Sequence, residues 1–152
     1  MAAEQLFRRA LAGKSAQIAG DPDQPYTYTY APDIGKALTL LGERDEALGR
    51  AQHLPSPGTV TTRELVHRVF EECGTRPKVQ RSSRMLLRAL GLFNPALHET
   101  VEMLYELEEP FVLDHSSFAR TFGDHATPLK ESIWRTVSWY RDRQPSDPDA
   151  RR

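Results

Sequence analysis

The sequence changes its periodicity abruptly after residue 30, and this change constrains the fold more than any other feature. Tyrosine and threonine alternate over Tyr26–Tyr30, and a period of two with β-forming residues predicts a strand. Pro32 then fits the first position of a helix, where Asp33 interacts favourably with the positive end of the helix dipole. Four apolar residues follow at helical spacing, namely Ile34, Ala37, Leu38 and Leu41. We therefore expect a strand that leads directly into a helix.

Two further helices are well marked in the first half of the chain. Residues 3–11 place apolar side chains on one face, and Gly13 follows as a stop signal. Thr61 and Glu64 form a capping box, in which Thr61 caps the helix and Glu64 reaches back to the cap. An apolar stripe follows this box, and Gly74 is placed to end the helix.

Helical patterns continue over residues 82–91 and 95–108. Asp114 is expected to cap a short helix that ends at Gly123. A cap residue followed by proline, Thr127-Pro128, predicts the start of the last helix.

Short β-type segments separate these helices. Besides Tyr26–Tyr30, the sequence predicts short strands or extended pieces at Ala16–Ala19, Gln52–Leu54, Lys78–Gln80 and Phe111–Leu113. Because short strands alternate with helices, the expected fold class is α/β (α+β), helix-rich with a few short strands.

Length and composition limit the classes of protein. A chain of 152 residues suits one domain, which we expect over residues 1–143, with a Pro/Ser/Asp/Arg-containing disordered tail over 144–152. The net charge of −1 argues against a nucleic-acid partner, and the single cysteine, Cys73, rules out an internal disulfide. Without a signal-peptide core or an apolar run of about 20 residues, we expect no membrane association and a cytoplasmic protein.

Neither the histidines nor the arginines form a convincing site. The five histidines and Cys73 lack the spacing of known metal motifs, so no metal site is predicted. Arg81, Arg84 and Arg88 share one helical face that could bind a phosphate or an acidic partner, but a solvated helix face explains them more simply.

In their order and spacing, these elements resemble the C-terminal part of an extended short-chain dehydrogenase/reductase of the NAD-dependent epimerase/dehydratase type. The resemblance covers roughly residues 2–143. It rests on the helix over residues 2–13, the turn Gly20-Asp21, the strand Tyr26–Tyr30, the helix led by Asp33, the segment His53–Ser56, the helix capped by Thr61, the short helix after Asp114, and the last helix with Trp139 and Tyr140. It implies the substrate domain of such an enzyme without the Rossmann half.

Two motifs of that family are absent from these residues. The nucleotide half begins with a Gly-rich turn that lets the backbone approach the pyrophosphate, and the sequence has no such turn. The catalytic pair of the family is Tyr-x-x-x-Lys, yet no tyrosine here is followed by lysine four residues later. The resemblance therefore assigns no catalytic or cofactor-binding residue. The family uses NAD or NADP, but we expect this chain alone to bind neither. Two alternatives follow for Met1: it is the true start of the protein, or it is an internal start within a longer enzyme.

The resemblance suggests a substrate site formed by Tyr26, Tyr28, Tyr105 and Phe111. Tyr26 and Tyr28 lie on a strand that contacts substrate in related enzymes, although alternating tyrosines are also good half-buried strand residues. Tyr105 and Phe111 lie where the substrate-domain loop of the relatives approaches its ligand. Asp33 matches a recurrent family aspartate, but its place at a helix start already explains it.

Two functional hypotheses follow. The first is a partial epimerase/dehydratase-like protein, a substrate-binding segment that is not catalytic alone. The alternative is a stand-alone, non-catalytic domain that binds a small molecule or assembles with itself. Both predict association, as a homodimer or with a Rossmann-type partner chain, because a substrate domain without its other half exposes apolar surface. Whether the chain is part of a working enzyme, and which substrate it binds, stay open.

Overall fold

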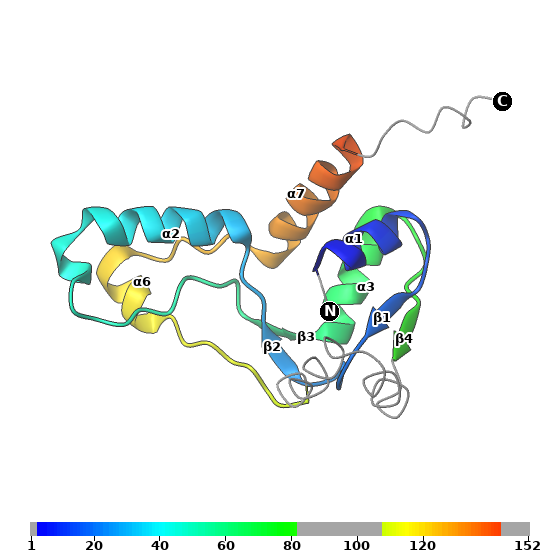
Figure 1. Cartoon of the computed structure of the whole chain (residues 1–152), viewed down its shortest axis with the longest axis horizontal. Helices are drawn as coiled ribbons and strands as arrows, with labels where there is room; N and C mark the ends of the chain where they lie inside the picture. Colours follow the sequence, from blue (N-terminus) through cyan, green and yellow to red (C-terminus); the bar gives the residue numbers. More distant parts are fainter. Residues whose placement is uncertain (1–2, 82–107, 144–152) are drawn as a thin grey trace, which may run out of the picture.

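The computed structural model describes residues 3–81 and 108–143, in which helices and short strands alternate (Figure 1). Their bounds are α1 Ala3–Leu11, β1 Ala16–Ile18, β2 Pro25–Thr27, α2 Ala31–Glu43, the 3-10 helix η1 Asp45–Ala47, β3 Thr59–Thr61, α3 Thr62–Cys73, β4 Val79–Arg81, α6 Ser116–Phe122 and α7 Leu129–Asp142. The expected helices over 82–91 and 95–108 (except Glu108), as well as Tyr105, Arg84, Arg88 and the tail 144–152, lie outside the described residues. None of the described helices is long and apolar enough to cross a bilayer.

The strands form two small sheets. β1 pairs with β4 in parallel, with Ala16 opposite Val79. β2 pairs with β3 in antiparallel orientation, with Pro25 opposite Thr61. On its other side β2 meets Phe111, whose backbone accepts a hydrogen bond from the Thr27 N–H at 2.8 Å and donates one to the Pro25 carbonyl at 2.9 Å. β2 is thus held on one side by β3 and on the other by the backbone at Phe111.

The main core lies where α1, α3 and α7 pack together and against β1 (Figure 1). Its buried side chains are those of Leu6, Ala10, Ala16, Ile18, Leu65, Val66, Val69, Phe70, Ile133 and Val137. Burying an aliphatic or aromatic side chain of this kind contributes about 1.5–3 kcal/mol. This cluster therefore fixes β1 and α3, between which the chain runs through β2.

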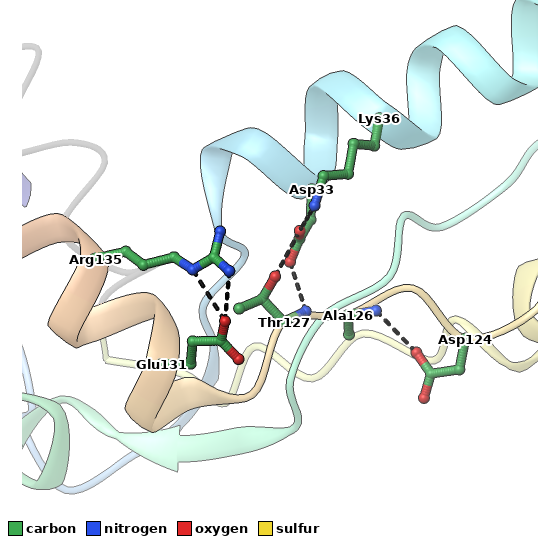
Figure 2. Close-up of polar contacts among 7 residues, drawn as sticks. All are labelled: Asp33, Lys36, Asp124, Ala126, Thr127, Glu131 and Arg135. Atoms are coloured by element: carbon green, nitrogen blue, oxygen red, sulfur yellow. Dashed lines mark hydrogen bonds and ion pairs between the residues drawn. The ribbon is translucent and has the colours of Figure 1, made fainter.

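A second part of the molecule, formed by α2 and α6, lies at the opposite end (Figure 1). Ala37 and Phe118 are buried there, and the Phe118 and Phe122 rings lie 5.1 Å apart between centroids. Figure 2 shows how the start of α2 is attached to the loop before α7, through hydrogen bonds from Thr127 to the Asp33 carboxylate.

The boundaries of α3 expected from its capping residues are confirmed. The Thr61 hydroxyl accepts a hydrogen bond from the Glu64 N–H at 3.1 Å, as expected for a cap. The Glu64 carboxylate, however, pairs with Arg68 one turn later. Gly74 ends α3 in the left-handed conformation, with φ of 72°, which glycine adopts without steric cost.

The strand predictions were less accurate. β2 covers Pro25–Thr27 rather than Tyr26–Tyr30, because the chain leaves its neighbours after Thr27. Gln52–Leu54 forms no strand, whereas Thr59–Thr61 is β3, a strand for which the sequence analysis predicts only that Thr61 caps the next helix. Such short segments carry little periodicity, and pairing depends on what lies beside them.

Two helix details also differ from expectation. Leu38 was placed on the buried face of α2, but it is 57% exposed, and of the residues of that helix only Asp33 and Ala37 are buried. Thr127 does not cap α7, since Pro128 occupies the cap position. Asp114 accepts a hydrogen bond from the Ser116 N–H at 2.9 Å, while His115 is the cap residue of α6.

Candidate functional site

Three aromatic side chains meet where β2 lies between β3 and the segment at Phe111. The ring centroids of Tyr26 and Tyr28 are 4.9 Å apart, and those of Tyr26 and Phe111 are also 4.9 Å apart. Residues two apart on extended backbone point to the same side, which explains the contact between the two tyrosines. We refer to Tyr26, Tyr28 and Phe111 as the aromatic cluster.

A small pocket of about 90 Å³ lies beside this cluster. It is lined by Ile18, Ala19, Asp21, Gln24, Tyr26, Tyr28 and Thr62. These residues come from β1, the turn after it, β2 and the first turn of α3. The main core fixes β1 and α3, so the pocket walls are held by elements that are themselves well packed.

The Tyr28 hydroxyl forms the polar edge of the pocket. It lies 2.6 Å from the Thr62 hydroxyl. Burial raises the pKa of Tyr28 above its ordinary value of 10.0, with a smaller increase from Tyr26 and a partial decrease from the Thr62 hydrogen bond. At neutral pH Tyr28 is therefore an uncharged phenol, which can donate and accept hydrogen bonds.

Asp21 supplies a carboxylate at the other edge of the pocket. One of its oxygens accepts a hydrogen bond from the Asp23 N–H at 3.0 Å, and the other accepts one from the Gln24 side-chain amide at 3.2 Å. The nearby Arg63 guanidinium forms a two-point ion pair with Asp23, at 2.7 and 2.9 Å. These contacts fix the turn and leave the pocket with a carboxylate at its rim.

Three of the four residues predicted for the substrate site come together. Tyr26 and Tyr28 line the pocket, and Phe111 packs on Tyr26 without lining it; Tyr105 lies outside the described residues. The sequence reasoning missed Asp21, Gln24 and Thr62 as pocket residues. The sequence identifies Gly20-Asp21 only as a turn and Thr61-Thr62 only as a helix start, and nothing in the sequence alone places these two segments beside one pocket.

Other reactive groups do not assemble into a centre. Within residues 3–81 and 108–143, no group of three His, Cys, Asp or Glu side chains is placed to hold a metal ion. His115 lies 3.8 Å from Asp124. The pKa of the half-buried Cys73 is raised by burial, which lowers the thiolate fraction on which cysteine reactivity depends.

Comparison with profiles of protein families and with curated proteins finds no match for the sequence. Solved structures do match. An epimerase from Methanothermobacter thermautotrophicus has a TM-score of 0.68 at 18% identity, and the match covers 91% of this chain and 36% of that one. A dTDP-glucose 4,6-dehydratase from Streptomyces venezuelae, with NAD and TYD bound, has a TM-score of 0.64 at 19% identity over 94% of this chain and 39% of that one.

A UDP-glucose 4-epimerase from Thermotoga maritima, with UDP-glucose, matches with a TM-score of 0.56 at 16% identity, over 91% of this chain and 38% of that one. The described fold is therefore that of part of an extended short-chain dehydrogenase/reductase. The chain spans less than half the length of the enzymes that it matches.

Proposed function

We propose that residues 1–143 are the substrate-binding segment of an NAD-dependent epimerase/dehydratase-like protein, with residues 144–152 as a tail. The observation that carries this proposal is the pocket beside Tyr26 and Tyr28, in a chain with the fold of part of such enzymes. Two of the matched structures contain TYD or UDP-glucose. A ligand of this protein would place one of its groups in the pocket, which at about 90 Å³ is smaller than the 300–1,000 Å³ typical of whole-ligand sites.

We propose further that this segment is not catalytic on its own. The 152 residues contain neither the Gly-rich turn nor the Tyr-x-x-x-Lys pair. The raised pKa of Tyr28 is opposite to what a tyrosinate acid/base requires. NAD or NADP and the catalytic pair would therefore be held by a Rossmann-type half, in the same polypeptide or in a partner chain, and the protein would work in the cytoplasm.

The experiment is a ligand-observed NMR titration of the full chain with UDP-glucose, dTDP-glucose, L-threonine and NAD. L-threonine is included because a partial-consensus L-threonine 3-dehydrogenase is also among the matched structures, with a TM-score of 0.65 at 16% identity. We expect at least one of the first three to bind, NAD not to bind, and the binding to be lost in Tyr26→Ala. Trp134→Ala is the matched control, because Trp134 is 53% exposed on α7 and does not line the pocket. Binding of NAD alone, or binding that Tyr26→Ala leaves unchanged, would contradict the proposal.

The second candidate is a stand-alone, non-catalytic domain that binds a small molecule or assembles with itself, and one observation supports association under either candidate. Large apolar side chains are exposed on several elements: Leu38, Leu48, Phe111, Val112, Trp134 and Trp139. Exposed apolar surface commonly marks an interaction site, so we propose that the chain associates, as a homodimer or with a Rossmann-type partner. Light scattering after size-exclusion chromatography should then show a mass that rises with concentration, and a strictly monomeric 17.3 kDa particle would argue against the homodimer.

A further inference from the structure

Among the described residues, one charged side chain lines the pocket beside the aromatic cluster, and it is negative. Of the described residues that form its wall, Asp21 bears a carboxylate and none is a lysine, arginine or histidine. The remaining polar groups are the Gln24 amide and the hydroxyls of Tyr28 and Thr62. The Gln24 amide donates one hydrogen bond to Asp21, and the two hydroxyls share one hydrogen bond, so the donors of the described wall are all uncharged.

The nearest guanidinium does not cancel this charge. Arg63 attracts Asp21 weakly through space, and this attraction raises the pKa of Arg63 less than its pairing with Asp23 does. Two of the three guanidinium nitrogens of Arg63 donate hydrogen bonds to the Asp23 carboxylate, at 2.7 and 2.9 Å. Of these three charged side chains, Asp21 lines the pocket, whereas Arg63 pairs with Asp23.

The aromatic side chains of the wall also favour a cationic ligand. Tyr26 and Tyr28 both line the pocket, and the faces of aromatic rings attract cations through the negative charge of their π-systems. The Tyr28 phenol stays neutral at physiological pH, because burial raises its pKa. Two tyrosine rings beside a carboxylate make a suitable environment for an ammonium group.

We propose that this pocket binds the cationic end of a small amine or quaternary ammonium compound. The inference rests on the proposed function, since it names the chemical group that the same pocket recognises. The volume of about 90 Å³ suits a group of several non-hydrogen atoms, because roughly 10–15 Å³ suffices for one water by this measure. Phosphate and carboxylate groups are disfavoured there, since the described part of the wall has the Asp21 carboxylate and no cation to meet them.

The test compares choline with 3,3-dimethylbutan-1-ol, which has the same shape but carries carbon in place of the charged nitrogen. Chemical-shift titration of the full chain measures both dissociation constants at pH 7. We expect choline to bind about two- to thirtyfold more tightly, as a cation–π contribution of about 0.5–2 kcal/mol implies. Asp21→Asn, which keeps an oxygen for the Asp23 N–H, and Tyr26→Leu should each remove most of this preference.

Glu46→Gln is the matched control, because it removes one negative charge from the exposed η1 and leaves the pocket wall unchanged. It should leave choline affinity within about twofold, as expected for a screened, distant charge. This inference would be overturned by any of three results. They are equal affinity for the two compounds, equal losses of choline affinity in Asp21→Asn and Glu46→Gln, and no binding of choline. If choline fails while a neutral or nucleotide-sugar ligand binds in a Tyr26-dependent way, the proposed function survives; if nothing binds, both fail.

Discussion

The carboxylate of Asp33 accepts two hydrogen bonds from Thr127, one from its backbone N–H at 2.7 Å and one from its hydroxyl at 2.8 Å. Asp33 is 2% exposed, and the Lys36 ammonium lies 3.4 Å from the same carboxylate. These contacts tie the first turn of α2 to the loop before α7, across 94 positions of sequence. A buried carboxylate is tolerated only when it is paired and hydrogen-bonded, so this contact has a structural role.

Removing this carboxylate should weaken the fold. We expect Asp33→Ala to lower the free energy of unfolding by about 2–4 kcal/mol, because hydrogen bonds to charged groups contribute about 1.5–3 kcal/mol each and the Thr127 donors lose their acceptor. Urea unfolding followed by circular dichroism measures the change. Lys36→Met is the control: the Lys36 side chain is 63% exposed, so its loss should cost less than about 1 kcal/mol. An unchanged midpoint for Asp33→Ala would show that the contact contributes nothing.

Two glycine substitutions should act in opposite directions. Gly74 has φ of 72° and Gly35 lies within α2, and an added methyl group would meet no atom within 4 Å at either position. Gly74→Ala should therefore cost about 1–2 kcal/mol through backbone strain alone. Gly35→Ala should stabilise by about 0.5–1 kcal/mol, because glycine is a poor helix residue. The same urea assay compares them, and shifts of equal sign would refute this explanation.

Tyr28 should make stability depend on pH at the alkaline end. Its pKa is raised in the folded state above the ordinary 10.0, so its contribution is fully present below pH 10 and is lost as the pH rises through the folded pKa. Between pH 9 and 11, the wild type should lose more stability than Tyr28→Phe, which has no group to ionise there. The test is to measure unfolding midpoints of both proteins across this pH range. If the midpoints of the wild type and Tyr28→Phe fall in parallel with pH, the prediction is wrong.

Cys73 should react slowly with alkylating reagents. Burial raises its pKa, Arg141 opposes this in part, and Glu72 adds to it, so the reactive thiolate is scarce at pH 8. We expect iodoacetamide to modify it more slowly than free cysteine, and more slowly still in Arg141→Gln. Arg135→Gln on the same helix is the control, since Arg135 pairs with Glu131. A faster reaction in Arg141→Gln would be the contrary outcome.

Local signals predicted the helices better than the strands. Thr61 and Gly74 mark the two ends of α3 as expected, because capping and left-handed glycine act within a few residues. Gln52–Leu54 has the residues of a strand but pairs with nothing among the described residues, whereas Thr59–Thr61 pairs with β2. Strand formation requires a partner, and the sequence of one segment does not contain that information.

The candidate site shows the same division. The alternation of Tyr26 and Tyr28 places both rings on one side of the chain, and they do contact each other. Asp21 and Thr62 could not be assigned to the same pocket, because they stand 41 positions apart in the sequence and meet through the packing of β1 and α3.

The sequence by itself determined the helical type of α1, α3 and α7 and the two ends of α3. It also determined the same-side placement of Tyr26 and Tyr28 and the absence of the Gly-rich and Tyr-x-x-x-Lys motifs from these residues. Only the tertiary structure decided that Asp33 binds Thr127 and that Asp21 lies at the pocket with Thr62. The physical reason is the distance along the sequence over which each interaction acts. Caps and periodicity act over a few residues of one chain segment, whereas burial and pairing depend on segments that the chain brings together only when it folds.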